Sequence, residues 1–230
     1  MRIVDLTVEL ADGTQSFPTH PKVTVIDFVT HSFSAPRYKL PCRGYASKLV
    51  MLSDHAGTHL DAPFHFYEDG PTINQVDLST TFGEAVLLDV SSKQADMPVS
   101  ADMLEKAAAG SDVKIKPGDI VLLHIWPGEW NGPGFHHCKA LDESAANWLA
   151  GKKIKALGLD LANADVNENM QRPVHLKLLG QGIGIIENLT NLWEIRAKRF
   201  HFFAVPLKIA GLSGSPVRAF AIEGMFQTSE

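Results

Sequence analysis

The chain has 230 residues, of which 45% are hydrophobic and 20% are charged, with a formal net charge of −5 at pH 7. This composition excludes a disordered chain, and the length fits one large domain, so we expect a single domain over residues 1–230. The acidic balance and the lack of a Lys/Arg cluster argue against nucleic acid as a partner.

The N-terminal residues 2–10 alternate apolar and polar side chains, which predicts a half-buried strand. The same segment lacks the apolar core of a signal peptide, and the two cysteines, Cys42 and Cys138, form no paired motif. No apolar run approaches the roughly 18 residues of a membrane helix. We therefore expect a cytoplasmic protein with no membrane partner.

Short apolar runs along the rest of the chain predict further strands at residues 23–29, 47–52, 85–90, 119–125, 154–160, 183–186, 202–205 and 219–222. Those at 85–90 and 119–125 are apolar almost throughout, which favours central strands. Capping patterns and helical spacing predict helices at 100–110 and 142–149, and a helical turn at 175–179. The elements show no regular βαβ repeat, so the predicted class is mixed, α/β or α+β.

The strongest chemical signal is the segment HAGTHLDAPFH at residues 55–65. Glycine and proline within it disfavour a helix and predict a loop after a strand end. His59 and Asp61, two residues apart, would share one side of an extended segment, and a turn at Gly57 brings His55 beside them. Two imidazoles and one carboxylate leave coordination positions open, as in catalytic metal sites. The alternative, a histidine-rich loop that only stabilises a turn, leaves these ionisable groups to compete without a cation.

Four segments resemble the metal-dependent hydrolases often labelled cyclases, which include bacterial kynurenine formamidase (arylformamidase) and isatin hydrolase. They are HAGTHLDAPFH, the GLD that ends at Asp160, HLKLLGQGIGIIENLTNL at 175–192 and VPLKIAGLSGSPVRAFAI at 205–222. The resemblance implies a metal centre of Zn²⁺ or Mn²⁺, with one or two ions per subunit. It assigns the metal ligands as His55, His59, Asp61, His175 and Glu187, and the catalytic acid/base as His65.

The resemblance also implies a function: hydrolysis of a small amide, as in the conversion of N-formylkynurenine to kynurenine and formate. Two kinds of alternative stay open. One is another reaction of the same family, on a cyclic amide such as isatin, on a lactone, or as a lyase; the other is a non-catalytic protein that binds a metal or small molecule. The implied fold is of the swivelling β/β/α type, a mixed sheet or barrel flanked by helices, assembled as a homo-oligomer, dimer or tetramer.

Four residues are candidates for substrate binding. Phe17, Phe64 and Trp126 would pack against an aromatic substrate, although Trp126 also suits simple packing beneath its own Gly/Pro-rich loop. Backbone amides near Ser215, in the GLSGSP segment, would donate to a carboxylate or oxyanion of the substrate.

Overall fold

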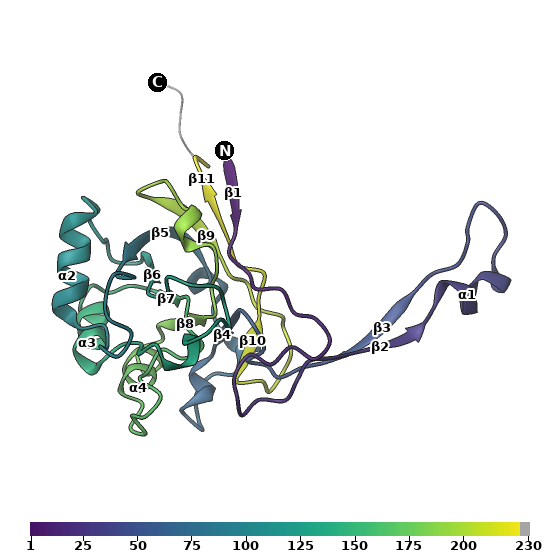
Figure 1. Cartoon of the computed structure of the whole chain (residues 1–230), viewed down its shortest axis with the longest axis horizontal. Helices are drawn as coiled ribbons and strands as arrows, with labels where there is room; N and C mark the ends of the chain where they lie inside the picture. Colours follow the sequence, from purple (N-terminus) through teal and green to yellow (C-terminus); the bar gives the residue numbers. More distant parts are fainter. Residues whose placement is uncertain (226–230) are drawn as a thin grey trace.

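The computed structural model describes residues 1–225, and its main feature is a nine-stranded mixed sheet, strongly curled into half a barrel (Figure 1). In spatial order the strands are β1 (Arg2–Asp5), β11 (Phe220–Glu223), β9 (Phe200–Phe203), β5 (Phe82–Asp89), β6 (Ile120–His124), β7 (Ala156–Leu159), β8 (Gly184–Glu187), β4 (His59–Asp61) and β10 (Gly214–Pro216). The predicted mixed class is confirmed. Residues 226–230 of the predicted single domain lie outside the described residues.

The centre of the sheet is parallel. Strands β5, β6, β7 and β8 pair in that order, and the chain passes between them through helices α2 (Ala101–Gly110), α3 (Glu143–Gly151) and α4 (Pro173–Leu179). These are three consecutive βαβ units, so the prediction of no regular repeat is wrong. The repeat is hidden because the helices are short and irregular segments, 125–142 and 160–172, separate two of them from the preceding strands.

Both faces of the central strands are buried, which explains their apolar sequences. Side chains alternate between the faces of a strand. Along β6, Val121 and Leu123 pack in the cluster that includes the three helices, whereas Ile120 and Leu122 pack in a second cluster on the opposite face. The prediction that 85–90 and 119–125 form central strands is confirmed, because β5 and β6 lie in the middle of the sheet.

Two short strands occupy segments for which the sequence predicts loops. Strand β4 lies within the histidine-rich segment and β10 within GLSGSP, and the two pair antiparallel at the edge of the sheet. The loop predictions are wrong at these residues because pairing with β8, a tertiary contact, makes β4 a strand. Pro216 is compatible with β10 because an edge strand leaves one side of its backbone unpaired. The N-terminal strand is also shorter than the predicted 2–10.

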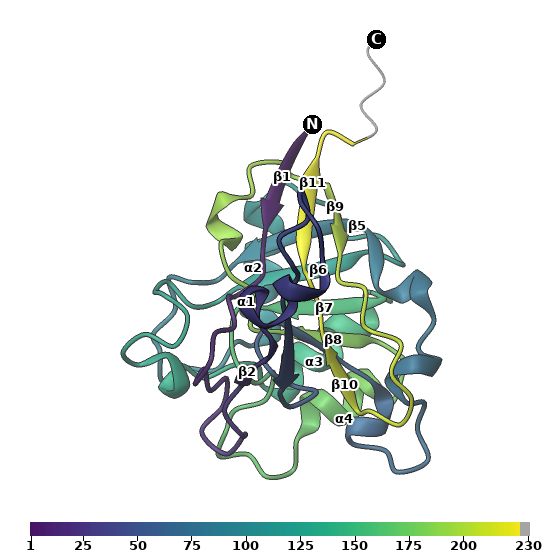
Figure 2. The same cartoon turned by 90° about the vertical axis from the view of Figure 1, so that its right-hand side faces the viewer.

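A separate two-stranded ribbon projects from the body of the molecule (Figures 1 and 2). It consists of β2 (Thr24–Val29) and β3 (Ser47–Met51), with α1 (His31–Ser34) near its far end. We call residues 24–51 the arm. Phe28 and Leu40 in the arm expose 76% and 80% of their surface, so the arm offers apolar side chains without a partner in the described chain.

The remaining short helices are 3-10 turns at Ala35–Arg37, Pro63–His65, Ile73–Gln75, Leu78–Thr80, Phe135–His137 and Leu192–Glu194. None of the helices in residues 1–225 has the length and apolar character that a bilayer span requires.

Candidate metal centre

Strand pairing between β4 and β8 gathers the first three side chains of the site. His59 and Asp61 alternate with the core residue Leu60, so both point to the face opposite Leu60. Glu187 lies directly across the ladder from His59, on the same face. Nε2 of His59 lies 3.3 Å from Oδ1 of Asp61 and 3.6 Å from Oε2 of Glu187. One imidazole and two carboxylates therefore meet on one sheet face, although more than a hundred residues separate Glu187 from the other two in the sequence.

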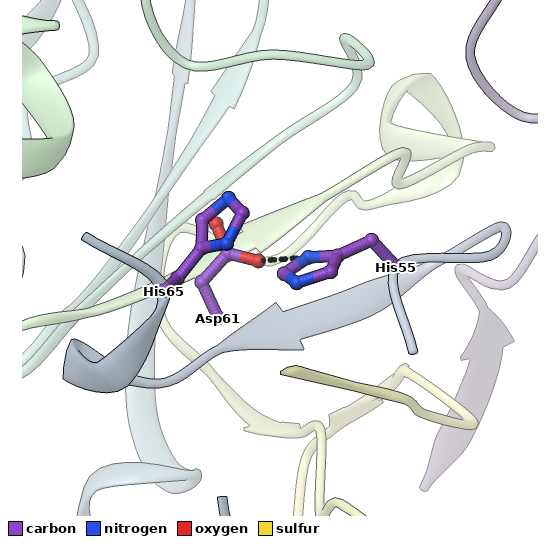
Figure 3. A group of neighbouring side chains, drawn as sticks. All are labelled: His55, Asp61 and His65. Atoms are coloured by element: carbon purple, nitrogen blue, oxygen red, sulfur yellow. Dashed lines mark ion pairs between the residues drawn. The ribbon is translucent and has the colours of Figure 1, made fainter. Parts of the chain in front are cut away.

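Three more histidines reach the same point from outside the sheet. Helix α4 brings His175, whose Nε2 lies 3.3 Å from Oε1 of Glu187. His55 comes from the loop before β4, and His65 from the 3-10 turn after it. The rings of His55 and His65 lie 4.1 Å apart, centroid to centroid. Figure 3 shows the Asp61 carboxylate directed at His55, with His65 beside it.

The carboxylate of Asp61 is the centre of this cluster. It is 1% exposed, and its oxygens lie 2.8 Å from Nδ1 of His55 and 3.5 Å from Nε2 of His175. None of these approaches has hydrogen-bond geometry, and neither oxygen has a hydrogen-bond partner among the described residues. A buried carboxylate without donors is strongly unfavourable unless a cation neutralises it.

The ring nitrogens that face the carboxylates are oriented by hydrogen bonds on the opposite side of each ring. Nδ1 of His59 donates to the carbonyl of Gly57 over 2.8 Å, and Nδ1 of His175 donates to Asp165 over 2.6 Å. In the neutral ring this places the lone pair on Nε2. Metal-binding histidines are oriented in this way in proteins.

The pKa values of the cluster show how much it favours positive charge. Burial lowers the pKa of His59, but Asp61, Glu187 and the Gly57 carbonyl outweigh burial and raise it to about 9. The pKa of His175 is likewise raised well above its usual value, against burial, by Asp165, Asp61 and Glu187. Burial raises the pKa of Asp61, yet the surrounding imidazoles hold it well below its ordinary range. Protons on the histidines and a bound cation are alternative ways to balance the same carboxylates.

The donor atoms form two groups that share Asp61. His55, Asp61 and His65 offer ligand atoms within 4.8 Å of one another, and so do His59, Asp61 and Glu187. His175 lies beside the second group. Imidazole and carboxylate ligands suit Zn²⁺ and Mn²⁺, and the orphaned oxygens of Asp61 supply the charge that such an ion needs. The residues present therefore fit a divalent metal, and the first group offers His65 as a ligand as well as an acid/base.

A cavity of about 140 Å³ opens onto the cluster. Its lining consists of Phe17, His20, His55, His59, His65, Phe66, Ala162, Asn163, Arg172, His175, Glu187 and Asn188. Of the four candidate substrate contacts, Phe17 lines the cavity, and the other three are not brought to it. Trp126 donates its Nε1 to the carbonyl of Glu129 and packs beneath its own loop, and Ser215 is fully buried in β10. Phe64 lies in the 3-10 turn just before His65 and does not line the cavity. The aromatic ring that lines the cavity there is Phe66.

Several residues of the site carry no recognisable sequence signal. Asp165 orients His175 and lies in the irregular segment LANADVNEN. The one sequence feature that could have indicated its role is that an aspartate ahead of a helix can accept the free amides of the first turn. Asn163 reaches the cavity from the same segment, and Arg172 reaches it from the residues just after that segment. His20 belongs to the proline-containing loop at 17–21, and burial lowers its pKa. Only the fold shows that these loops surround one cavity.

Comparison with known proteins connects this geometry to a family. The cyclase family model matches residues 4–166. A kynurenine formamidase from Geobacillus thermodenitrificans (strain NG80-2) is 30% identical over 172 residues, which cover 74% of this chain and 77% of that protein. A kynurenine formamidase from Bacillus thuringiensis (strain Al Hakam) is 31% identical over 174 residues, with the same shares covered.

Solved structures agree on the fold. Isatin hydrolase A from Labrenzia aggregata, bound to benzyl benzoate, has a TM-score of 0.80 at 22% identity and covers 96% of this chain and 93% of its own. Isatin hydrolase A from Ralstonia solanacearum has a TM-score of 0.81 at 23% identity, with 96% and 92% covered. The family match over most of the sequence, the formamidase relatives and the shared fold lead to one conclusion: the chain belongs to the cyclase family.

Proposed function

We propose that the chain is a metal-dependent hydrolase that cleaves the carbon–nitrogen bond of a small amide, with N-formylkynurenine as the first candidate substrate. The observation that carries the proposal is the buried Asp61 carboxylate, which lacks a hydrogen-bond partner in the described chain and has histidine nitrogens converging on it. The kynurenine formamidases at about 30% identity support the substrate class.

The ligands in this proposal are His55, His59, Asp61, His175 and Glu187, with Asp61 shared between two sites. When bound, Zn²⁺ or Mn²⁺ supplies Lewis-acid chemistry, which makes water a nucleophile at neutral pH and polarises a carbonyl. The chain itself contributes the orientation of the ligands. Gly57 and Asp165 fix two of the imidazole rings, and burial of the carboxylates excludes competing solvent.

His65 is the proposed acid/base. Burial lowers its pKa to about 4, assisted by His55 and His175 and opposed by Asp61, so the ring is neutral at pH 7 and has a nitrogen lone pair free. Its side chain lines the cavity beside Asp61. It would take a proton from the attacking water and return it to the departing nitrogen, as general acid–base catalysis requires.

The discriminating experiment assays metal-supplemented protein in parallel on N-formylkynurenine and on isatin, a cyclic amide. We expect turnover of N-formylkynurenine. Turnover of isatin alone would select the cyclic-amide alternative. Inactivity on both, with metal bound, would contradict amide hydrolysis and leave a lactonase, a lyase or a non-catalytic binding protein.

Two variants separate the roles of the residues. His65→Ala should retain the metal and lose turnover by about 100-fold or more, as loss of a general acid/base does. Asp61→Ala should lose metal and turnover together. If His65→Ala also loses metal, the residue is a ligand, and if it remains fully active, the acid/base role is wrong.

The proposal includes assembly into a homo-oligomer through the arm. The arm stands away from the body of the molecule (Figure 1). It carries three apolar side chains that are more than half exposed: Phe28, Phe33 and Leu40. Apolar side chains gathered on a projecting segment are typical of protein–protein contacts. A second copy of this chain is the proposed partner.

A further inference from the structure

Arg172 lines the metal-site cavity, and the proposed hydrolysis leaves its side chain without a role. Its Nη1 is buried and has no hydrogen-bond partner in residues 1–225. The guanidinium groups of two other arginines each pair with a carboxylate: Arg199 with Asp119, and Arg218 with Asp5. Because a buried N–H donor without an acceptor is unfavourable, this unpaired Nη1, in a side chain that lines the cavity, indicates that its acceptor belongs to a ligand.

The backbone holds Arg172 in place. Its φ and ψ are both 48°, in the left-handed region that residues other than glycine rarely adopt. Its amide donates to the carbonyl of Asn169, and its own carbonyl accepts the amide of Leu176. Arg172 immediately precedes α4, which carries His175. The same short segment therefore holds the backbone of Arg172 and the imidazole that faces Glu187.

The rest of the cavity limits what the ligand can be. Two aromatic rings, Phe17 and Phe66, line it together with the histidine and carboxylate cluster. The carboxylates Asp61 and Glu187 face the histidines, and no ion pair joins either of them to Arg172 in the described chain. A ligand that fills this space would thus place its reacting group at the cluster, apolar atoms against the rings and an anion at Arg172. A planar guanidinium binds carboxylates with two hydrogen bonds.

We propose that Arg172 binds a carboxylate of the substrate, remote from the bond that is cleaved, and so selects anionic amides over neutral ones. This inference rests on the proposed amide hydrolysis and adds a specificity determinant to it. N-formylkynurenine has the required chemistry, because its amino-acid carboxylate is separate from its formamide group. Formanilide has an aryl formamide and no carboxylate, so it serves as the neutral comparison.

The test measures kcat and KM of wild type, Arg172→Gln and Arg172→Lys, all metal-supplemented, on N-formylkynurenine and formanilide. Loss of a charge-assisted pair predicts a KM for N-formylkynurenine raised on the order of 10- to 100-fold in Arg172→Gln, with less than about twofold change on formanilide. Arg172→Lys should be intermediate. Exposed Arg196 provides the matched control, and Arg196→Gln should behave as wild type. Equal losses on both substrates, or no loss on either, would overturn the inference.

Binding of the product gives a second readout that does not depend on turnover. Calorimetry with kynurenine should show affinity for the metal-supplemented wild type that falls by the same factor in Arg172→Gln. Arg172→Gly should lose the affinity and keep its melting temperature, because glycine accepts the left-handed backbone. Wild type that hydrolyses neither amide contradicts the proposed function; wild type that fails to bind kynurenine, or binds it independently of Arg172, contradicts this inference.

Discussion

The carboxylate of Asp165 accepts a hydrogen bond from Nδ1 of His175 over 2.6 Å and also accepts the backbone amides of Val174 and His175. One buried side chain thus satisfies free amides at the start of α4 and fixes the ring that faces Glu187. Neither task requires Asp165 to touch a metal. Its effect on a metal would be indirect, through the orientation and basicity of His175.

Substitution of Asp165 should therefore weaken metal binding without abolishing the fold. Asp165→Asn keeps the shape of the side chain and removes its charge, and we expect metal affinity to fall by about 10- to 100-fold. Competition with a chromophoric chelator measures it. Asp142 caps α3 in a similar way, but its carboxylate bonds Ser144 and Ala145 and no histidine of the site, so Asp142→Asn should leave metal affinity unchanged. Unaltered affinity in Asp165→Asn would contradict its positioning role.

Because Gly214 has no side chain, the His55 ring can pack directly against its backbone. A Cβ added at Gly214 would lie 2.6 Å from Cε1 of His55, so Gly214→Ala must displace the ring. A displacement of about 1 Å at a reacting site costs on the order of 100-fold in rate, and we expect a loss of that size in kcat/KM. Gly110→Ala is the matched control, since a Cβ there meets nothing within 4 Å and should stabilise α2 slightly. Wild-type activity in Gly214→Ala would rule out the present position of His55 in the active enzyme.

Glu223 should make stability depend on pH in the acidic range. Burial alone raises the pKa of Glu223, but the amides of Arg196 and Ala197 outweigh burial. With the help of Arg2 they hold the pKa below its usual value. A lowered pKa means that Glu223 stabilises the fold above about pH 4.5, and that this contribution is lost as the pH falls through the folded-state pKa.

Glu223→Gln removes this contribution. The free energy of unfolding at pH 7 should fall by about 1–3 kcal/mol, as for hydrogen bonds to a charged group. Between pH 5 and 3 the variant should lose less stability than wild type, which denaturant titrations at several pH values will show. Parallel acid profiles for the two proteins would refute the assignment.

The arm should determine the oligomeric state. Phe28→Asp places a charge on an exposed apolar position of β2, where it would oppose burial against a second copy. Light scattering coupled to size exclusion should show an oligomer for wild type and a smaller species for the variant. Leu78→Asp, at an exposed apolar position on the body, should assemble like wild type. A monomeric wild type would contradict assembly through the arm.

Local patterns in the sequence predict most of the fold. Apolar runs identify β5 and β6 as central strands, and Ser100 and Asp142 mark the starts of α2 and α3, where their side chains accept backbone amides. The short strands β4 and β10 could not be predicted, because each has only three residues and depends on tertiary pairing, β4 with β8 and β10 with β4. The same dependence on tertiary contacts hides the βαβ repeat.

The residues of the site likewise divide into those that the local sequence indicates and those that only the fold brings together. The spacing of His59 and Asp61 along an extended segment indicates that they share a face, and the structure places them together. Family resemblance assigns Glu187 and His175 as ligands, and their predicted positions at a strand end and at the start of a helical turn agree with that assignment without requiring it. The predicted contacts of Phe64, Trp126 and Ser215 depended on loop geometry, which a single sequence does not specify. Asp165 orients His175, and Arg172 adds a positive charge to the cavity wall. Both lie in the irregular segment 160–172, so only the folded structure shows that they belong to the site.

The most direct test is elemental analysis of protein purified without chelators, combined with turnover of N-formylkynurenine before and after chelator dialysis. We expect one or two equivalents of Zn²⁺ or Mn²⁺ per chain, loss of turnover when the metal is removed, and recovery when it is restored. Metal-free protein that hydrolyses the substrate at full rate, indifferent to chelators, would contradict the account.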